Sequence, residues 1–197
     1  MQMIIIALKN FICLTGLILI SPLLIVCCIL IFLEDGRPFF FKQKRLGLNQ
    51  EIFIIYKLRT LKKTAPQVGT HELDISFKLR AGKIIRALKL DEFPQLLNVM
   101  KGDINLVGPR PGLDSQSQLK ESRLLLGIFD IKPGITGLSQ ILGYDMSNPG
   151  RLAEVDKIYI ENHTMQLDLT ILLGTFTSSP RKYLSSKFDI PNLKNTL

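Results

Sequence analysis

Two adjacent carboxylates stand at the start of a segment with helical spacing. Asp91 and Glu92 precede Pro94, which a first helical turn tolerates, so we expect a helix over 91–100 that starts near Leu90 or Asp91. An ionised carboxylate can attack a phosphorus centre or hold Mg²⁺. A helix N-terminus favours that ionised form by about 0.3–1 kcal/mol. Acidic residues are also common in first turns, so the pair alone leaves a structural role open.

The same segment has two faces at helical spacing. The apolar face comprises Leu90, Phe93, Leu97 and Met100, and the polar face comprises Asp91, Gln95 and Asn98. We expect the apolar face to pack and the polar face to present an acid and two amides.

Arg110 lies between two prolines in Gly108-Pro109-Arg110-Pro111. Proline fixes its own backbone and pushes the preceding residue to an extended form, so Arg110 is held between two stiff units. A guanidinium held in this way suits bidentate binding of phosphate. A plain surface turn is the alternative.

A set of basic residues elsewhere could join Arg110 in balancing a diphosphate, although each of them alone is also consistent with a solvated surface charge. The set is Lys57, Arg59, Arg80 and Arg86.

The elements that must position these residues are a hairpin and several helices. Aromatic and β-branched residues over 37–61 flank a Gly/Asn turn at 47–50, which is the signal of a β-hairpin. Besides 91–100, helices are expected over 75–89, over 114–126, from Asn148-Pro149 onward, and over an apolar stretch at 166–176 that would lie on a membrane. The expected fold class is α+β, helix-rich with a small β-hairpin.

A membrane segment precedes the hairpin. Phe11 to Leu33 carries no charge over 23 residues, and about 20 suffice to cross a bilayer as a helix. Ser21-Pro22 interrupts it, because proline removes a backbone donor. A kinked spanning helix and a re-entrant hairpin both remain open, and Ser21 could supply a partner to the freed backbone. We expect residues 1–35 to form the membrane part and 36–197 the catalytic domain.

Charge indicates where that domain lies and what it meets. Of 25 Lys and Arg and 17 Asp and Glu residues, only Lys9, Glu34 and Asp35 fall within 1–35, so the remainder is strongly basic. Basic residues crowd directly after the apolar segment, which favours the cytoplasmic side, and all three cysteines lie inside that segment. The balance suits anionic lipids or nucleotide phosphates. Aromatic residues do not alternate with the basic ones, which argues against nucleic acid as a partner.

Several long motifs together resemble the bacterial sugar transferase family, the small monotopic phosphoglycosyl transferases that prime glycan assembly. They cover nearly the whole chain in the family's order. The matching stretches are Ser21-Pro22, Ile55 to Thr60, Leu90 to Asp103, Leu106 to Pro111, Lys132 to Gly137 and Asp156 to Asn162.

The resemblance implies an activity and its residues. Asp91 would attack the β-phosphate of a UDP-sugar, UMP would leave, and undecaprenyl phosphate would take the phosphosugar from an aspartyl intermediate. Glu92, with Asp91, would hold Mg²⁺ or assist the second step. Arg110 and Pro111 would bind phosphate with Lys57, Arg59 and Arg86 nearby.

The resemblance also implies a location. Ser21-Pro22 would break a re-entrant helix at the cytoplasmic face of the bacterial inner membrane, with interfacial amphipathic helices and membrane lipids around it. Oligomeric state is open, with a homodimer as one alternative.

One stretch departs from the family pattern. Many members read Gly-Trp-Ala-Gln where this chain has Gly137-Leu138-Ser139-Gln140, and an arginine that often follows is replaced by Tyr144. Gln140 belongs to the part expected to touch nucleotide or sugar, so the sugar is open, with an N-acetylated 6-deoxy sugar weakly indicated. The alternative from another class is a non-catalytic basic membrane adaptor, which explains charge and anchor but not the acidic pair.

Overall fold

The computed structural model describes residues 2–66 and 75–195 and divides into two compact units. Unit 1 comprises Met1–Gln43 and Ile54–Gly102, and unit 2 comprises Lys44–Phe53 and Asp103–Leu197. The predicted boundary at residue 35 coincides with the end of the first helix, whereas compactness groups that helix with residues 54–102. The functional division at residue 35 stays a prediction.

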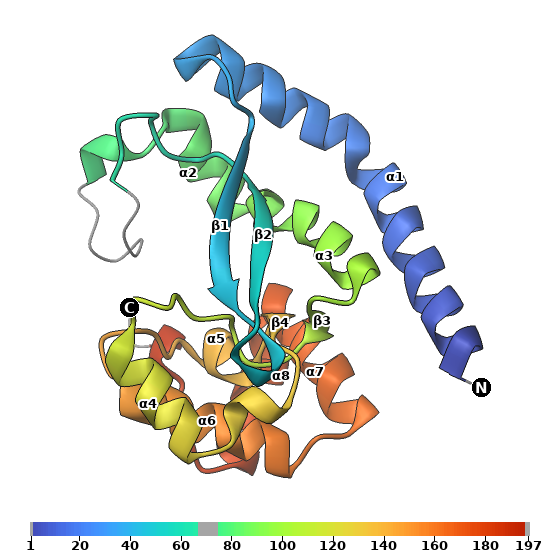
Figure 1. Ribbon diagram of the computed structural model, residues 1–197, viewed down its shortest axis with the longest axis vertical. Helices are drawn as coiled ribbons and strands as arrows, with labels where there is room; N and C mark the ends of the chain where they lie inside the picture. The colour runs from blue at the N-terminus through green and yellow to red at the C-terminus, as the bar shows by residue number, and fades with distance from the viewer. Residues whose placement is uncertain (1, 67–74, 196–197) are drawn as a thin grey trace. The chain divides into compact units, whose positions relative to one another are not determined.

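Unit 1 holds the long apolar helix, most of the hairpin and the acidic turn (Figure 1). Its elements are α1 (Gln2–Asp35), parts of β1 (Phe40–Leu46) and β2 (Ile52–Leu58), η3 (Ile75–Phe77), α2 (Arg80–Ala87), η4 (Leu90–Gln95) and α3 (Leu96–Lys101). The strands β1 and β2 form a two-stranded sheet, which confirms the predicted hairpin. Their turn contains a short helix, η1 (Leu48–Gln50), and belongs to unit 2.

The core of unit 1 joins α1 to the elements around the acidic turn. Its buried members are Cys27, Ile31, Leu58, Leu79, Ile85 and Leu90. Cys13 is also buried, so two of the three cysteines are core residues on one side of α1. Most other large apolar side chains of α1 are exposed. One face of this helix therefore packs on protein, and the rest would need an apolar environment.

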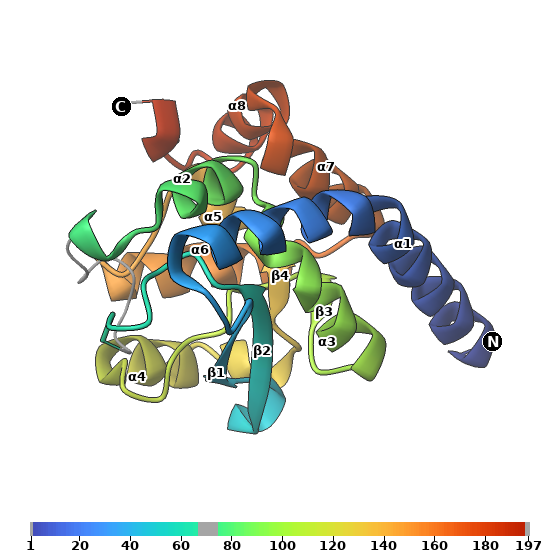
Figure 2. The same ribbon diagram turned by 90° about the horizontal axis from the view of Figure 1, so that it is seen from above.

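The helix α1 runs through Ser21-Pro22 without interruption in its helical assignment, and Figure 2 shows its axis bending along its length. Pro22 cannot donate to the carbonyl of Ile18 four residues earlier. The Ser21 hydroxyl donates to that carbonyl instead, at 2.8 Å, as the sequence suggested. Residues 6–35 are long and apolar enough to cross a membrane, and only 11% of an apolar 18-residue window within them is buried. Re-entrant topology stays a prediction.

Unit 2 is mostly helical around one parallel strand pair. It contains β3 (Asn105–Val107), α4 (Ser117–Leu125), η5 (Ile128–Asp130), β4 (Gly134–Thr136), α5 (Leu138–Leu142), α6 (Pro149–Glu161), α7 (Met165–Phe176), α8 (Ser178–Lys187) and η6 (Leu193–Asn195). Strands β3 and β4 pair in parallel, with Asn105 opposite Gly134 and Val107 opposite Thr136. The core lies between these strands and α4 to α8.

Several helix predictions are confirmed, with shifted ends. Asn148 caps α6 by accepting from the backbone N–H of Arg151 at 3.0 Å, and the apolar stretch at 166–176 is α7. The helix predicted over 114–126 is α4. Helix α5, helix α8 and the parallel pairing were not predicted.

Two helix boundaries differ from expectation for local reasons. The helix predicted over 75–89 starts only at Arg80, because Lys78 bridges Leu61 and the Leu79 N–H bonds to the Thr60 carbonyl, which keeps 78–79 extended. The helix predicted over 91–100 splits into the 3-10 helix η4 and the α-helix α3. Pro94 lacks the N–H that would bond to the Leu90 carbonyl in an α-helix.

Candidate active site

The acidic pair lies in the first turn of η4, directly after Lys89, whose backbone is left-handed at φ 56°. Asp91 is only 9% exposed, and Glu92 is half-buried. Lys57 of β2 places its Nζ 2.8 Å from Oε1 of Glu92, with side-chain exposures of 14% and 20%. The structure thus pairs Lys57 with Glu92, both of which the sequence analysis selected, and Asp91 adjoins Glu92 in the same turn.

The prediction of a packed apolar face and an exposed polar face over 91–100 is wrong. The contacts made by the buried polar residues show how Lys57 is positioned. Asn98 is fully buried; its Oδ1 accepts from the Tyr56 N–H at 3.2 Å and its Nδ2 donates to the Ile54 carbonyl at 2.6 Å. Gln95 is also buried, whereas Leu97 of the supposedly packing face is 44% exposed. The amide of Asn98 serves the backbone of β2 as a neighbouring strand would. It thereby fixes the stretch of β2 from which Lys57 projects.

Arg86 lies in the last turn of α2, and its Nε donates to the Thr60 hydroxyl at 2.6 Å. Helix α2 approaches this part of the chain closely at Gly82, where a Cβ would lie 2.3 Å from the Thr60 carbonyl oxygen. Only glycine permits that distance. Arg86 is therefore held at a fixed place in the same unit as Asp91.

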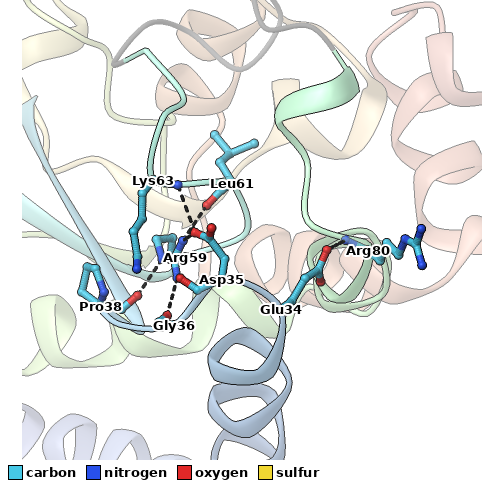
Figure 3. A network of polar contacts seen from close by, with 8 residues as sticks. All are labelled: Glu34, Asp35, Gly36, Pro38, Arg59, Leu61, Lys63 and Arg80. Carbon is cyan, nitrogen blue, oxygen red and sulfur yellow. Dashed lines mark hydrogen bonds and ion pairs between the residues drawn. The ribbon is translucent and has the colours of Figure 1, made fainter.

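Arg59 is buried, and its guanidinium contacts the end of α1 (Figure 3). It forms an ion pair with the Asp35 carboxylate. It also donates to the carbonyls of Pro38 at 2.6 Å, Gly36 at 2.6 Å, Leu61 at 3.2 Å and Asp35 at 3.3 Å. The substrate-binding role predicted for Arg59 stays a prediction, and these contacts show that the side chain joins β2 to α1.

The neighbouring Glu34 joins α1 to α2 in the same view (Figure 3). Its two carboxylate oxygens accept from the backbone N–H groups of Arg80 at 2.6 Å and Ala81 at 2.9 Å. Carboxylates satisfy the unpaired N–H groups at a helix start and favour its positive end. Glu34 therefore fixes the start of the helix that ends with Arg86.

In unit 2, the segment carrying Arg110 is held by its backbone carbonyls. Those of Pro109 and Gly112 accept from backbone N–H groups of Gly134 at 2.9 Å and Leu46 at 3.0 Å. Those of Arg110 and Pro111 accept from the guanidinium groups of Arg123 at 2.7 Å and Arg45 at 3.2 Å. This rigidity matches the expectation from the flanking prolines.

Arg123 belongs to a buried polar cluster beneath this segment. Its Nη2 lies 2.6 Å from Oδ2 of Asp156, and the two side chains are 3% and 1% exposed. The Ser139 hydroxyl donates to Oδ1 of Asp156 at 2.7 Å. Burial raises the pKa of the Asp156 carboxyl, and Arg123 and the Ser139 hydroxyl oppose that rise. The guanidinium is what compensates this buried carboxylate.

Gln140 follows Ser139 in α5 and is half-buried. Its Nε2 donates to the Ile135 carbonyl at 3.1 Å. Its Oε1 is buried and has no hydrogen-bond partner within the described residues. The predicted contact of Gln140 with substrate stays a prediction.

The predicted site residues thus fall into two sets. Unit 1 holds Lys57, Arg59, Arg86, Asp91 and Glu92, and unit 2 holds Arg110, Pro111 and Gln140. Sequence reasoning missed the partners that position them, above all Arg123 and Asp156. A signal existed for Asp156, which lies four residues after Leu152 and three before Tyr159 on the apolar face of α6.

The two adjacent carboxylates can be compared with the groups that commonly hold Mg²⁺ in proteins. Within residues 2–66 and 75–195, no group of three or more His, Cys, Asp or Glu residues could enclose a metal ion. Magnesium is commonly held by one or two carboxylates, with substrate phosphates and water completing its shell. Asp91 and Glu92 would be two such carboxylates, Glu92 being paired with Lys57 here, and the predicted magnesium site stays a prediction.

Comparison with known proteins supplies the family. The bacterial sugar transferase family matches residues 2–182. One relative is the uncharacterized sugar transferase EpsL of Bacillus subtilis, which is 39% identical over 80% of this chain and 82% of its own length. A second is the UDP-glucose:undecaprenyl-phosphate glucose-1-phosphate transferase of Caulobacter vibrioides, which is 35% identical over 81% of this chain and 63% of its own length. A third is the UDP-N-acetylgalactosamine-undecaprenyl-phosphate N-acetylgalactosaminephosphotransferase of Aeromonas hydrophila, which is 36% identical over 80% of this chain and 39% of its own length. The match thus spans less than two thirds of the latter two. The chain is a transferase and belongs to the bacterial sugar transferase family.

Proposed function

We propose that this enzyme transfers a sugar 1-phosphate from a UDP-sugar to undecaprenyl phosphate and releases UMP, as the first step of building a bacterial surface glycan. The activities for which the Caulobacter and Aeromonas relatives are named support the substrate class. The observation that carries the proposal is the pair of adjacent carboxylates in η4, of which Glu92 has a lysine ammonium 2.8 Å away. One acid is thereby neutralised beside the other.

The reaction proceeds in two displacements at one phosphorus atom. A carboxylate oxygen of Asp91 bonds to the β-phosphorus while the bond to the bridging oxygen breaks, and UMP leaves with that electron pair. A terminal oxygen of undecaprenyl phosphate then bonds to the same phosphorus, and the bond to Asp91 breaks. The carboxylate is regenerated and the product is a polyprenyl diphosphate sugar.

Cations lower the repulsion between an anionic nucleophile and an anionic diphosphate. Lys57 supplies one fixed positive charge beside Glu92, and Arg86 and Arg110 are proposed to bind phosphate oxygens. Magnesium held by Asp91 and Glu92 would neutralise phosphate charge further when bound. Gln140 is proposed to contact the nucleotide or the sugar, and an N-acetylated 6-deoxy sugar is the weakly favoured donor.

The lipid acceptor requires the catalyst to work at a membrane. We propose that α1 anchors the enzyme at the cytoplasmic face of the inner membrane in a re-entrant arrangement, with a break at Ser21-Pro22. Helix α7 carries an exposed apolar row formed by Met165, Leu169, Leu173 and Phe176 at helical spacing. Such a row suits a helix lying in the membrane interface. A reporter at the N-terminus that is labelled from the periplasm would contradict the re-entrant topology.

The decisive experiment follows UMP release from a panel of UDP-sugars with undecaprenyl phosphate and detergent-solubilised enzyme. Asp91→Asn should lower turnover by about a thousandfold or more, because an amide is a poor nucleophile. Asp114→Asn removes an exposed carboxylate paired with Lys120 and is the matched control with unchanged turnover.

Without lipid phosphate, mass spectrometry of the wild-type enzyme should find the phosphosugar on the peptide containing Asp91. Normal turnover by Asp91→Asn would contradict the proposal that Asp91 is the nucleophile. Membrane binding without turnover of any UDP-sugar by the wild type would favour the adaptor alternative.

A further inference from the structure

One buried side chain holds the backbone of the segment at Arg110 itself. Of the four successive carbonyls from Pro109 to Gly112, two accept from backbone N–H groups and one from a partly exposed arginine. The carbonyl of Arg110 itself accepts from Arg123, whose side chain is 3% exposed. The hydrogen bond from Arg123 therefore holds the backbone of Arg110, the residue whose side chain is proposed to bind phosphate.

The guanidinium of Arg123 contacts one acceptor through each of its two terminal nitrogens. Its Nη1 donates to the Arg110 carbonyl at 2.7 Å, and its Nη2 lies 2.6 Å from Asp156. Its Nε is buried and has no partner within the part of the chain that the structure describes. A planar fork can reach two acceptors at fixed angles, which a lysine ammonium does not reproduce.

Asp156 is fixed in turn from a second element. Its other oxygen accepts from Ser139 at the start of α5, while Asp156 itself belongs to α6 and Arg123 to α4. Three helices therefore converge on one buried carboxylate that orients one guanidinium. The contacts of Nη1 and Nη2 orient the guanidinium, while its Nε has no partner among the described residues.

We propose that Arg123 and Asp156 are positioning residues for Arg110: the buried pair sets the backbone from which Arg110 reaches a phosphate of the nucleotide-sugar, and Ser139 orients the pair. This inference rests on the proposed function, because it assigns the pair an effect on donor binding. It explains why a fully buried ion pair lies directly beneath an otherwise proline-stiffened turn. A hydrophobic trio of similar volume would fill the space without orienting the Arg110 carbonyl.

The test is a double-mutant cycle on the KM for the UDP-sugar. Arg110→Ala should raise that KM about tenfold or more, as expected for loss of a charge-assisted contact. Arg123→Lys keeps the charge beside Asp156 but loses the fork, so it should raise the same KM about three- to tenfold. In the Arg110→Ala background, Arg123→Lys should have no further effect on KM, since it acts through Arg110.

Controls separate positioning from loss of folded protein. A purely structural role would lower the active fraction, and with it the apparent kcat, while KM stayed unchanged. Arg151→Lys alters an exposed arginine paired with Glu154 on the same unit and should leave KM unchanged. An unchanged KM in folded Arg123→Lys, or an equal rise in both backgrounds, would overturn the inference.

A milder variant decides the matter where Arg123→Lys does not fold. Ser139→Ala removes only the hydroxyl that orients Asp156, so a rise in KM of about twofold that disappears in the Arg110→Ala background supports positioning. No change in KM would overturn it. Asp91→Asn, measured in parallel, reports on the proposed nucleophile separately, because its loss affects kcat whether or not Arg123 acts on Arg110.

Discussion

The two units each contain a close ion pair, and the pairs differ in their access to water. Lys57 and Glu92 in unit 1 lie 2.8 Å apart with side chains 14% and 20% exposed. Arg123 and Asp156 in unit 2 lie 2.6 Å apart and are 3% and 1% exposed. A pair that keeps contact with solvent can exchange its partner for a substrate group or a metal ion. A fully buried pair cannot, and its charges serve to hold neighbouring backbone in place.

The largest effect is expected from breaking the buried pair. Asp156→Ala should lower the free energy of unfolding by about 3–5 kcal/mol, because it leaves the Arg123 charge buried without compensation. Replacing both residues, as in Arg123→Met with Asp156→Leu, should restore much of that loss. Denaturant unfolding in detergent measures both variants. Equal stability of Asp156→Ala and wild type would remove the distinction between the two pairs.

The buried pair should also show a characteristic pH dependence. In Arg123→Met, the Asp156 carboxyl loses the guanidinium that opposes the rise of its pKa from burial. A carboxyl whose pKa is raised on folding binds a proton more readily in the folded protein, so stability falls as the pH rises above the ordinary aspartate range. The destabilisation by Arg123→Met should therefore be greater at pH 8 than at pH 5. A penalty that shrinks with rising pH would contradict this reading.

The solvent-accessible pair should behave in the opposite way, with a large effect on activity and a small one on stability. Lys57→Gln removes the charge beside Glu92 and should lower kcat by about 100- to 1000-fold, the range found when one preorganised electrostatic group is removed from a site. The free energy of unfolding should change by about 1 kcal/mol or less, because the pair is partly screened. Unfolding and UMP-release assays on one preparation would show whether the two effects separate.

An effect of intermediate size is expected from Asn98, which holds the strand that carries Lys57 of the Lys57–Glu92 pair. Asn98→Ala removes both hydrogen bonds to β2 and leaves the Ile54 and Tyr56 backbone groups without that partner. We expect a loss of about 1–3 kcal/mol in unfolding free energy. Turnover should fall as well, because β2 carries Lys57. Asn98→Asp keeps one acceptor and is the informative companion, and a stable but inactive Asn98→Ala would show that positioning dominates.

The smallest effect is expected at the exposed pair on α6. Glu154→Gln breaks the ion pair with Arg151, in which Nη1 of Arg151 lies 2.7 Å from Oε2 of Glu154. The side chain of Glu154 is 56% exposed and that of Arg151 is 39% exposed. Exposed pairs of this kind contribute little, so stability should change by less than about 0.5 kcal/mol. Thermal unfolding at low and high salt measures the difference. A loss comparable with that of Asp156→Ala would mean that burial does not separate the pairs.

Local sequence predicted the features that depend on near neighbours in the chain. The Gly/Asn turn gave the hairpin, Asn148-Pro149 gave the start of α6, and the flanking prolines of Arg110 gave a stiff segment that the structure holds by its carbonyls. Ser21 compensates for Pro22 within a single helical turn. The turn, the helix cap, the Ser21 contact and the stiffening by proline each act over four residues or fewer, so the residue types suffice to reveal them. The groups that hold the carbonyls around Arg110 come from distant parts of the chain, and the sequence did not reveal them.

Contacts between distant parts of the chain could not be read in this way. The amide of Asn98 looked like a presented side chain, and only the packing of α3 on β2 turned it into a backbone partner. Arg59 was selected as a candidate phosphate ligand, which stays a prediction, and only the fold showed its contacts with the end of α1.

The order of residues was enough to predict the apolar helix, the acidic pair, the proline-bounded arginine and the family resemblance. Which charges are paired, and how deeply they are buried, became known only from the folded chain. Lys57 and Glu92 are 35 residues apart, and Arg123 and Asp156 are 33 apart. The interaction energy of a charged side chain depends on the distance to its partner and on its exclusion from water. Both quantities are set only when the chain folds and brings distant residues together.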